Sequence, residues 1–302
     1  MATKELFLDT LGSILKIPPA DIDTTKDYFS MGGNSINAAR LVVTLRKKGV
    51  KLALSDFLDA KSLDDLFAKV KVNDPLKKFS KIYDEDEKFA LVDLGECPDH
   101  KEAIDFLTKS FFERDALVIC CKTTYERLRK AFELMWDYTI KVNYSIGVVE
   151  KSTGKIVAAN LNYDYAVYDK DFDWVAAWPE EVLPIFAAVE VLEEELKDAT
   201  IRAKDGAWFY SFIFGTKDAL DHRENLAVTH LVSRSTEKFA KAKNCVGLTV
   251  IDTSPVTGAL DDEYGYTALG SFQLNTFDLE GRKPFAECED FHEMKFFYKF
   301  IE

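Results

Sequence analysis

The sequence predicts a small all-α domain of four helices, followed by a larger α/β (α+β) domain built on a mixed central sheet. Apolar residues recur at helical spacing in the first part of the chain, whereas strand-like runs alternate with helical ones from residue 89 onward. A length of 302 residues is enough for two hydrophobic cores at the usual domain size. We therefore place the domains at residues 1–75 and 89–302, with a linker at residues 76–88.

The first domain is expected to hold its four helices in a short stretch of chain. Leucines at helical spacing mark the first helix, which ends before the proline pair at residues 18–19. Ser35 opens the second helix, and the third and fourth are expected at residues 54–57 and 63–70. Beyond them, Asn73-Asp74-Pro75 and a charged run interrupt the helical period, which indicates the linker.

The second domain is expected to begin with a strand, two helices and a hairpin. The hairpin turns at Ser152-Thr153-Gly154-Lys155, and Pro179 stands in the first turn of the helix that follows. The expected elements are a strand at 89–94, helices at 100–112 and 123–142, hairpin strands at 144–151 and 156–167, a helix at 179–196, a strand at 207–215, a helix at 221–243, a strand at 246–251, a helix from residue 254, and strands at 268–277 and 291–300.

Composition and charge exclude several classes of function. The net charge is −13, from 39 basic and 52 acidic residues, which disfavours nucleic acid and anionic membrane as partners and favours small cations such as amines. Five cysteines without a C-x-x-C pair indicate neither a disulfide framework nor a zinc site, so a reduced, cytoplasmic setting is expected. Acidic runs at 84–87 and 261–263 are interpreted as solvated loops, and no metal site is expected.

Residues 27–36, Asp-Tyr-Phe-Ser-Met-Gly-Gly-Asn-Ser-Ile, form the most informative motif. Paired glycines permit a sharp turn, and Ser35 then lies at a helix N-terminus, where an anion is favoured. The simpler alternative is a glycine turn with Ser35 as an N-cap. The motif resembles the attachment loop of carrier domains. That resemblance implies 4'-phosphopantetheine on Ser35, a phosphopantetheinyl transferase that attaches it and an upstream adenylation domain that loads it, so the chain is expected to begin within a longer protein.

The order of elements in the second domain is similar to that of the Gcn5-related N-acetyltransferases, in their arylalkylamine N-acetyltransferase branch. Residues 111–117, Phe-Phe-Glu-Arg-Asp-Ala-Leu, resemble the segment that supplies the catalytic carboxylate, so the resemblance implies Asp115 as the base, with Glu113 as its nearby substitute. Residues 250–257 resemble the strand end and turn that face the thioester, with Thr257 on the serine position.

Two further interpretations concern side chains near this expected site. Asp115 follows a Phe-Phe pair and precedes an apolar run, so burial is expected to raise its pKa; the alternative is that it only caps or turns the chain. Tyr163 and Asp164, with Tyr165, are candidates to frame an aromatic amine, although alternating tyrosines on a strand are also common packing residues.

The expected donor differs from that of the family. These acetyltransferases hold the pyrophosphate of coenzyme A on a glycine-rich turn, where this chain has Asp221-His222-Arg223-Glu224-Asn225-Leu226-Ala227. A carrier domain beside such an acyltransferase resembles the C-terminal part of the insect β-alanyl amine synthases, which implies transfer of a carrier-held β-alanyl group to dopamine or histamine. Two alternatives are a coenzyme A-dependent N-acetyltransferase fused to a carrier domain and a non-catalytic amine-binding domain.

Overall fold

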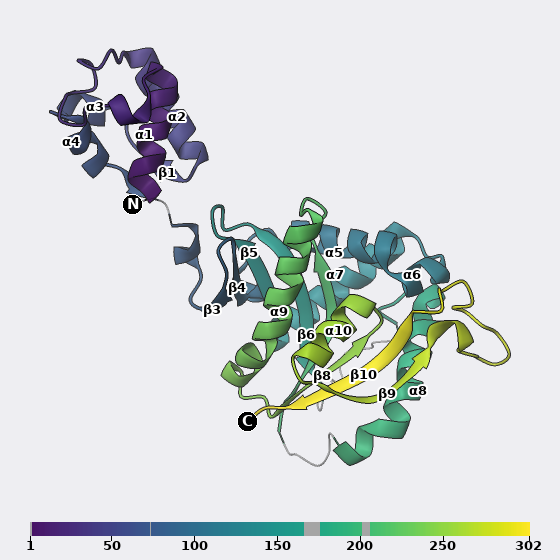
Figure 1. Ribbon diagram of the computed structural model, residues 1–302. Coiled ribbons are helices and arrows are strands. Elements are labelled where there is room, and N and C mark those ends of the chain that lie inside the picture. The colour runs from purple at the N-terminus through teal and green to yellow at the C-terminus, as the bar shows by residue number, and fades with distance from the viewer. Residues whose placement is uncertain (1, 73, 166–175, 201–205) are drawn as a thin grey trace. The chain divides into compact units, whose positions relative to one another are not determined.

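A computed structural model describes residues 2–72, 74–165, 176–200 and 206–302 of the chain. It contains two compact units, one formed by Met1–Lys77 and the other by Lys78–Lys151 and Lys155–Glu302 (Figure 1). Each unit has its own hydrophobic core. A small helical unit therefore precedes a larger one built on a sheet, and the predicted fold class is confirmed.

The first unit contains the four predicted helices. They are α1 (Ala2–Leu15), α2 (Ser35–Lys47), α3 (Asp56–Asp59) and α4 (Leu63–Ala68). Phe7 and Leu11 of α1 pack with Leu41 and Leu45 of α2 in a fully buried core. The antiparallel pair β1 (Val50–Lys51) and β2 (Lys71–Val72) was not predicted, because two residues are too short to show strand alternation.

The second unit is built on one sheet of eight strands in the order β3-β4-β5-β6-β7-β8-β10-β9. Neighbouring strands are antiparallel except β7 and β8, which are parallel, so the sheet is mixed as predicted. The strands are β3 (Ile82–Glu85), β4 (Phe89–Asp93), β5 (Ile146–Glu150), β6 (Ile156–Asp164), β7 (Trp208–Thr216), β8 (Gly247–Asp252), β9 (Thr267–Gln273) and β10 (Glu293–Phe300).

Helices connect these strands and cover both faces of the sheet. The helices are α5 (His100–Arg114), α6 (Ala116–Cys121), α7 (Tyr125–Val142), α8 (Leu183–Thr200), α9 (His222–Ala242) and α10 (Pro255–Glu263). The short helix α6 was not among the predicted elements. The end of the predicted hairpin strand, residues 166–167, lies outside the described residues.

Strand β3 differs from the sequence interpretation, which assigned residues 76–88 to a linker. Residues 82–85 instead pair with β4 at the edge of the sheet. Only Tyr83 of this strand is buried, against Phe239 at a ring distance of 4.5 Å. This short strand has one buried side chain, and charged residues surround it. Its composition therefore resembles that of a linker, because an edge strand exposes most of its side chains to solvent.

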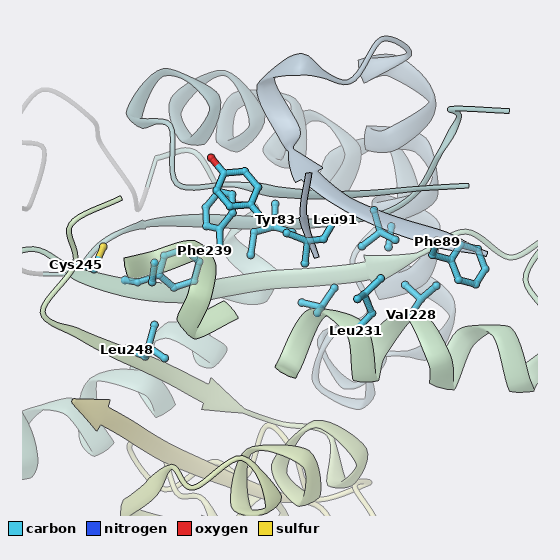
Figure 2. Packing of buried hydrophobic residues seen from close by; sticks show 14 of the residues in the cluster. Tyr83, Phe89, Leu91, Val228, Leu231, Phe239, Cys245 and Leu248 are labelled. Atoms are coloured by element: carbon cyan, nitrogen blue, oxygen red, sulfur yellow. The ribbon is translucent and has the colours of Figure 1, made fainter. Parts of the chain in front are cut away.

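Helix α9 packs on one face of the sheet, while α5 and α7 lie against the other (Figure 1). Val228 and Leu231 of α9 contact the cluster that includes Phe89 and Leu91 of β4, as Figure 2 shows. On the opposite face, a Cβ atom added to Gly215 of β7 would lie 2.8 Å from Leu107 of α5, so this helix packs directly on the strand. The two helical layers thus enclose the sheet between them.

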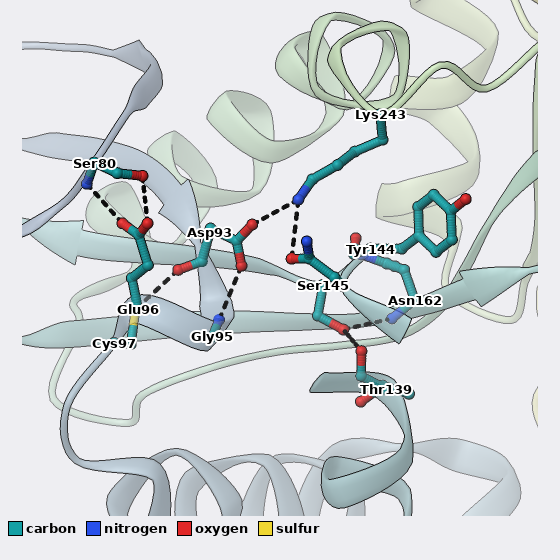
Figure 3. Close-up of polar contacts among 11 residues, drawn as sticks. Ser80, Asp93, Gly95, Glu96, Cys97, Thr139, Tyr144, Ser145, Asn162 and Lys243 are labelled. Carbon is teal, nitrogen blue, oxygen red and sulfur yellow. Dashed lines mark hydrogen bonds and ion pairs between the residues drawn. The ribbon is translucent and has the colours of Figure 1, made fainter. Parts of the chain in front are cut away.

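A polar network joins the end of α9 to the strands (Figure 3). The ammonium group of Lys243 lies 2.7 Å from a carboxylate oxygen of Asp93 and 2.9 Å from Oδ1 of Asn143. Both members of the Lys243–Asp93 pair are mostly buried, with side chains 14% and 15% exposed. Nearby, the backbone N–H of Asn162 donates to Oγ of Ser145. These contacts hold the C-terminal end of α9 beside the C-terminal end of β4.

Candidate functional site

The loop before α2 presents Ser35 to solvent. Gly32 has a φ of +85°, the left-handed conformation that favours glycine. Gly33 packs so closely on Tyr28 that an added Cβ atom would lie 2.3 Å from the tyrosine ring. The Tyr28 hydroxyl in turn donates to the carbonyl oxygen of Asn34 at 3.2 Å. Both glycines are therefore required by the shape of this loop.

The N-cap of α2 is Asn34, whose side chain accepts from the backbone N–H of Asn37 at 2.9 Å. Ser35 is the first helical residue and is exposed. The alternative in which Ser35 serves as the N-cap is therefore wrong, because the neighbouring asparagine has that role. A hydroxyl at the positive end of a thirteen-residue helix favours a phosphate ester electrostatically.

The second unit contains a cavity of about 310 Å³ where β7 and β8 separate. The two strands pair from Trp208 with Gly247 to Ser211 with Val250, and both continue beyond the last pair. Side chains of α5, α6, α7 and α8 line the cavity, and so do side chains of α9 and α10. Since these helices come from both layers, the cavity passes through the sheet between the diverging strands.

Asp115 lies in this cavity, between α5 and α6. One carboxylate oxygen accepts from the backbone N–H of Val118 at 2.8 Å and so caps α6. Burial raises the pKa of the Asp115 carboxyl, while that backbone hydrogen bond and the nearby His292 and Thr253 oppose the shift in part. A partly buried acid with a raised pKa is suited to hold an amine and to take up its proton.

Glu113 is not among the residues that line the cavity. Its side chain is 52% exposed on the outer face of α5 and lies 3.9 Å from the ammonium group of Lys109. One helical turn contains both acidic residues, but only Asp115, at the end of the helix, turns inward. The structure therefore does not bring the substitute base to the same place as Asp115.

Tyr163 lines the cavity beside other aromatic rings, whereas Asp164 does not. The ring of Tyr163 lies 5.4 Å from that of Phe212, and Trp178 lies 6.4 Å from the same phenylalanine. Asp164 Oδ1 instead accepts from the backbone N–H of Trp208 at 2.9 Å. Successive side chains of a strand point to opposite sides, so the two residues separate as strand geometry requires.

Thr257 also lines the cavity, from the first turn of α10. The same end of the cavity contains Asp252 and Asp261, which are only 6% and 7% exposed. The interpretation of residues 261–263 as a solvated loop is wrong for Asp261, which lies on the inner face of α10.

The N-terminus of α9 is closed by its own side chains. Asp221 Oδ1 accepts from the backbone N–H of Glu224 at 2.8 Å, and the Glu224 carboxylate accepts from the backbone N–H of Asp221 at 3.2 Å. Glu224 also forms an ion pair with Lys88. This capping box occupies amide groups that would otherwise be available to an anion, and it adds negative charge there.

Some possible site types find no support in the part of the chain that the structure describes. Among these residues, His, Cys, Asp and Glu side chains do not gather in groups of three that could hold a metal ion. The helices of the same ranges include none that is long and apolar enough to cross a membrane.

Comparison with known proteins identifies the first unit. Residues 5–70 match the family described as phosphopantetheine attachment site. The first unit is a carrier domain. Its prosthetic group is 4'-phosphopantetheine, and the exposed hydroxyl of Ser35 at the start of α2 has the position and freedom that such a group requires.

The chain as a whole is similar to the β-alanyl-bioamine nonribosomal peptide synthetase Ebony of Drosophila melanogaster. The two are 27% identical over 305 residues, which cover 96% of this chain and 33% of Ebony. The chain thus spans about a third of the length of that relative. The predicted resemblance to the C-terminal part of a β-alanyl amine synthase is confirmed.

Solved structures resemble the second unit. The C-terminal condensation domain of Ebony, in complex with β-alanyl-dopamine, matches 71% of this chain and 99% of its own, with a TM-score of 0.63 and 25% identity. Arylalkylamine N-acetyltransferase 2 of Aedes aegypti matches 71% of this chain and 99% of its own, with a TM-score of 0.54 and 14% identity. The second unit thus has the fold of these acetyltransferases.

Proposed function

We propose that this chain joins a carrier-held β-alanyl group to a biogenic amine, such as dopamine or histamine, to form an N-β-alanyl amide. An adenylation domain would activate the β-alanine, and a phosphopantetheinyl transferase would first modify Ser35. When attached there, the prosthetic group supplies the thiol on which the acyl group is held as a thioester. The similarity to Ebony over 96% of the chain supports the proposal, and so does the acid-containing cavity in the second unit.

The residues of the cavity have defined tasks in this proposal. Asp115 attracts the protonated amine, accepts its proton and leaves a neutral nitrogen that can attack the acyl carbon. Tyr163, Phe212 and Trp178 offer faces and edges to an aromatic or imidazole ring. The enclosing helices exclude water, which limits hydrolysis of the activated acyl group.

The closed N-terminus of α9 is the observation that favours a carrier-held donor over free coenzyme A. A pyrophosphate at this position would compete with the Asp221 and Glu224 carboxylates for the amide groups and would be repelled by both. An acyl group on a covalently attached arm needs no such contact. Attachment to the same chain also raises its effective concentration.

The test compares the two donors directly. Protein carrying β-alanyl-phosphopantetheine on Ser35 is mixed with dopamine or histamine, and amide formation is followed in a single turnover. The Ser35→Ala protein receives free β-alanyl- or acetyl-coenzyme A at micromolar concentration instead. We expect rapid amide formation only from the loaded protein. Comparable amide formation by Ser35→Ala from free acyl-coenzyme A would favour a coenzyme A-dependent N-acetyltransferase. Amine binding without amide formation from either donor would favour a non-catalytic amine-binding domain.

We also propose that this reaction takes place in the cytoplasm. All five cysteines are free thiols, and Cys120 and Cys288 approach within 3.5 Å without a disulfide. Thiols so close together persist as thiols in a reducing compartment.

A further inference from the structure

Asp252 and Asp261 form a buried carboxyl pair at the α10 end of the cavity. Asp252 is the last residue of β8 and Asp261 lies on α10, and both line the cavity while being at least nine-tenths buried. Their carboxyl groups are close enough that each shifts the pKa of the other, and two carboxyl groups in contact can share one proton in a hydrogen bond. The pair therefore carries one proton and one negative charge when it is half ionised.

Burial controls the ionisation of this pair. Desolvation raises the pKa of Asp252 to about 6, and the hydrogen bonds of Asp261 and Thr257 reduce that shift. Desolvation and the charge of Asp252 raise the pKa of Asp261 to about 9. The other charged groups that act on the pair are Asp262 of α10 and Lys295 of β10. Burial and like-charge repulsion thus favour a pair that shares one proton and carries a single negative charge.

Lys295 lies opposite Asp252 in the β8–β10 pairing, but this charge has no ion-pair partner in the described ranges. Neither aspartate takes part in an ion pair there, and Lys295 is 3.2 Å from Glu293. No N–H or hydroxyl group of the described residues donates to Oδ2 of Asp252, although that atom is fully buried. An unpartnered buried carboxylate oxygen costs free energy unless a ligand satisfies it. A cationic group in the cavity beside the pair would offset part of this cost.

We propose that the Asp252–Asp261 pair binds the ammonium group of the acyl donor and so selects β-alanyl over uncharged acyl groups. This inference rests on the proposed function. The two reactants bring two amino groups, and the cavity holds two separate acidic sites. Asp115 serves the attacking amine on the α5 and α6 side, and the carboxyl pair serves the β-amino group on the α9 and α10 side.

The surroundings of the two acidic sites favour this assignment. The aromatic rings of the cavity include Tyr163, Phe212 and Trp178 from β6, β7 and the segment before α8, which suit a ring-bearing acceptor. By contrast, α9 contributes the hydroxyl-bearing Thr229, Ser233 and Thr236, and α10 contributes Thr257. A short aliphatic ammonium group matches a small polar compartment better than a catechol does. An ammonium group also has three N–H donors for the carboxyl and hydroxyl oxygens of this compartment.

The test uses butyryl as the uncharged counterpart of β-alanyl, since the two acyl groups differ only by a methyl group in place of ammonium. Each is placed on Ser35 from its acyl-coenzyme A by a phosphopantetheinyl transferase, and loading is checked by intact mass. Single-turnover amide formation with dopamine is then measured for wild type, Asp252→Asn and Asp261→Asn. Glu263→Gln, which removes an exposed carboxylate from the same helix, is the matched control.

We expect wild type and Glu263→Gln to use β-alanyl at least about tenfold faster than butyryl. In Asp252→Asn that preference should fall towards one, through slower β-alanyl transfer with butyryl transfer kept within about twofold, whereas Asp261→Asn keeps the Asp252 carboxylate and should retain most of the preference. Wild type without a preference would overturn the inference even if neither variant folds. An equal loss for both acyl groups would overturn it too, by assigning the pair a structural role. In both of these overturning outcomes wild type still forms the amide. Failure of the proposed function would instead abolish amide formation from either loaded acyl group.

Discussion

Replacement of Asp115 by asparagine should slow amide formation without unfolding the protein. The change removes the proton acceptor but keeps a side-chain oxygen that can cap α6 at the backbone N–H of Val118. Asparagine and aspartate are similar N-caps, so the stability of Asp115→Asn should remain within a few tenths of a kcal/mol of wild type. Loss of a general base usually costs about 10²- to 10⁴-fold in rate, or roughly 3 to 5 kcal/mol in the barrier.

Asp115→Ala separates the two roles of this residue. It removes the base and the cap together, so the same rate loss should be accompanied by a loss of about 1 kcal/mol in stability. The control is Glu113→Gln, on the exposed face of α5, which should leave the rate within about twofold.

The pH dependence has a definite sign. Burial raises the pKa of the Asp115 carboxyl in the folded protein above its value in the unfolded chain. The stability that the protonated carboxyl contributes is therefore fully present below the unfolded pKa and is lost as the pH rises through the folded pKa. A neutral asparagine should therefore cost no stability at neutral pH. In wild type, amide formation should decline as the pH falls through the raised pKa, and Asp115→Asn should lack that decline.

Single-turnover rates with β-alanyl-loaded protein and histamine, measured from pH 5 to 9, test these expectations, with stability measured by urea unfolding of the same samples. If Asp115→Asn matched wild type in rate across this range, the residue would be only the cap of α6 and the argument for a base would fail.

Three further predictions concern the carrier loop and the core. Ser35→Ala should abolish the mass gain from a phosphopantetheinyl transferase while urea unfolding stays unchanged; a mass gain in that variant would refute the assignment. Gly33→Ala should destabilise the carrier domain by about 1 to 3 kcal/mol, because its Cβ atom would lie 2.3 Å from the Tyr28 ring, and unchanged unfolding would contradict that packing. Lys243→Met should cost about 3 to 5 kcal/mol in the second unit, because Asp93 would remain buried without its cation, and a cost below 1 kcal/mol would show that water replaces the lysine.

Matched variants serve as controls for two of these measurements. Ser30→Ala changes another serine of the same loop and should retain the phosphopantetheine mass gain. Lys238→Met removes an exposed lysine from the same helix as the core variant and should change stability by less than about 0.5 kcal/mol.

The features that the sequence determined by itself are those encoded over a few adjacent residues. The Gly32-Gly33-Asn34-Ser35 turn needs only local backbone conformation, so the loop and the helix that follows it were predicted correctly. The order of helices and strands in the second unit was predicted for the same reason, because each long element carries its own periodicity. Asp221 was likewise recognisable as a hindrance to pyrophosphate, since a capping box spans only four residues.

The tertiary structure alone decided which polar side chains share the cavity. The sequence offered no geometric reason to reject Glu113 as the substitute for Asp115, yet the end of α5 turns only Asp115 inward. Asp252 and Asp261 resemble ordinary acidic residues at a strand end and in a charged run, and they become a buried pair only because α10 folds back over β8. Burial of a charge depends on what other segments bring against it, and a local pattern has no information about those segments.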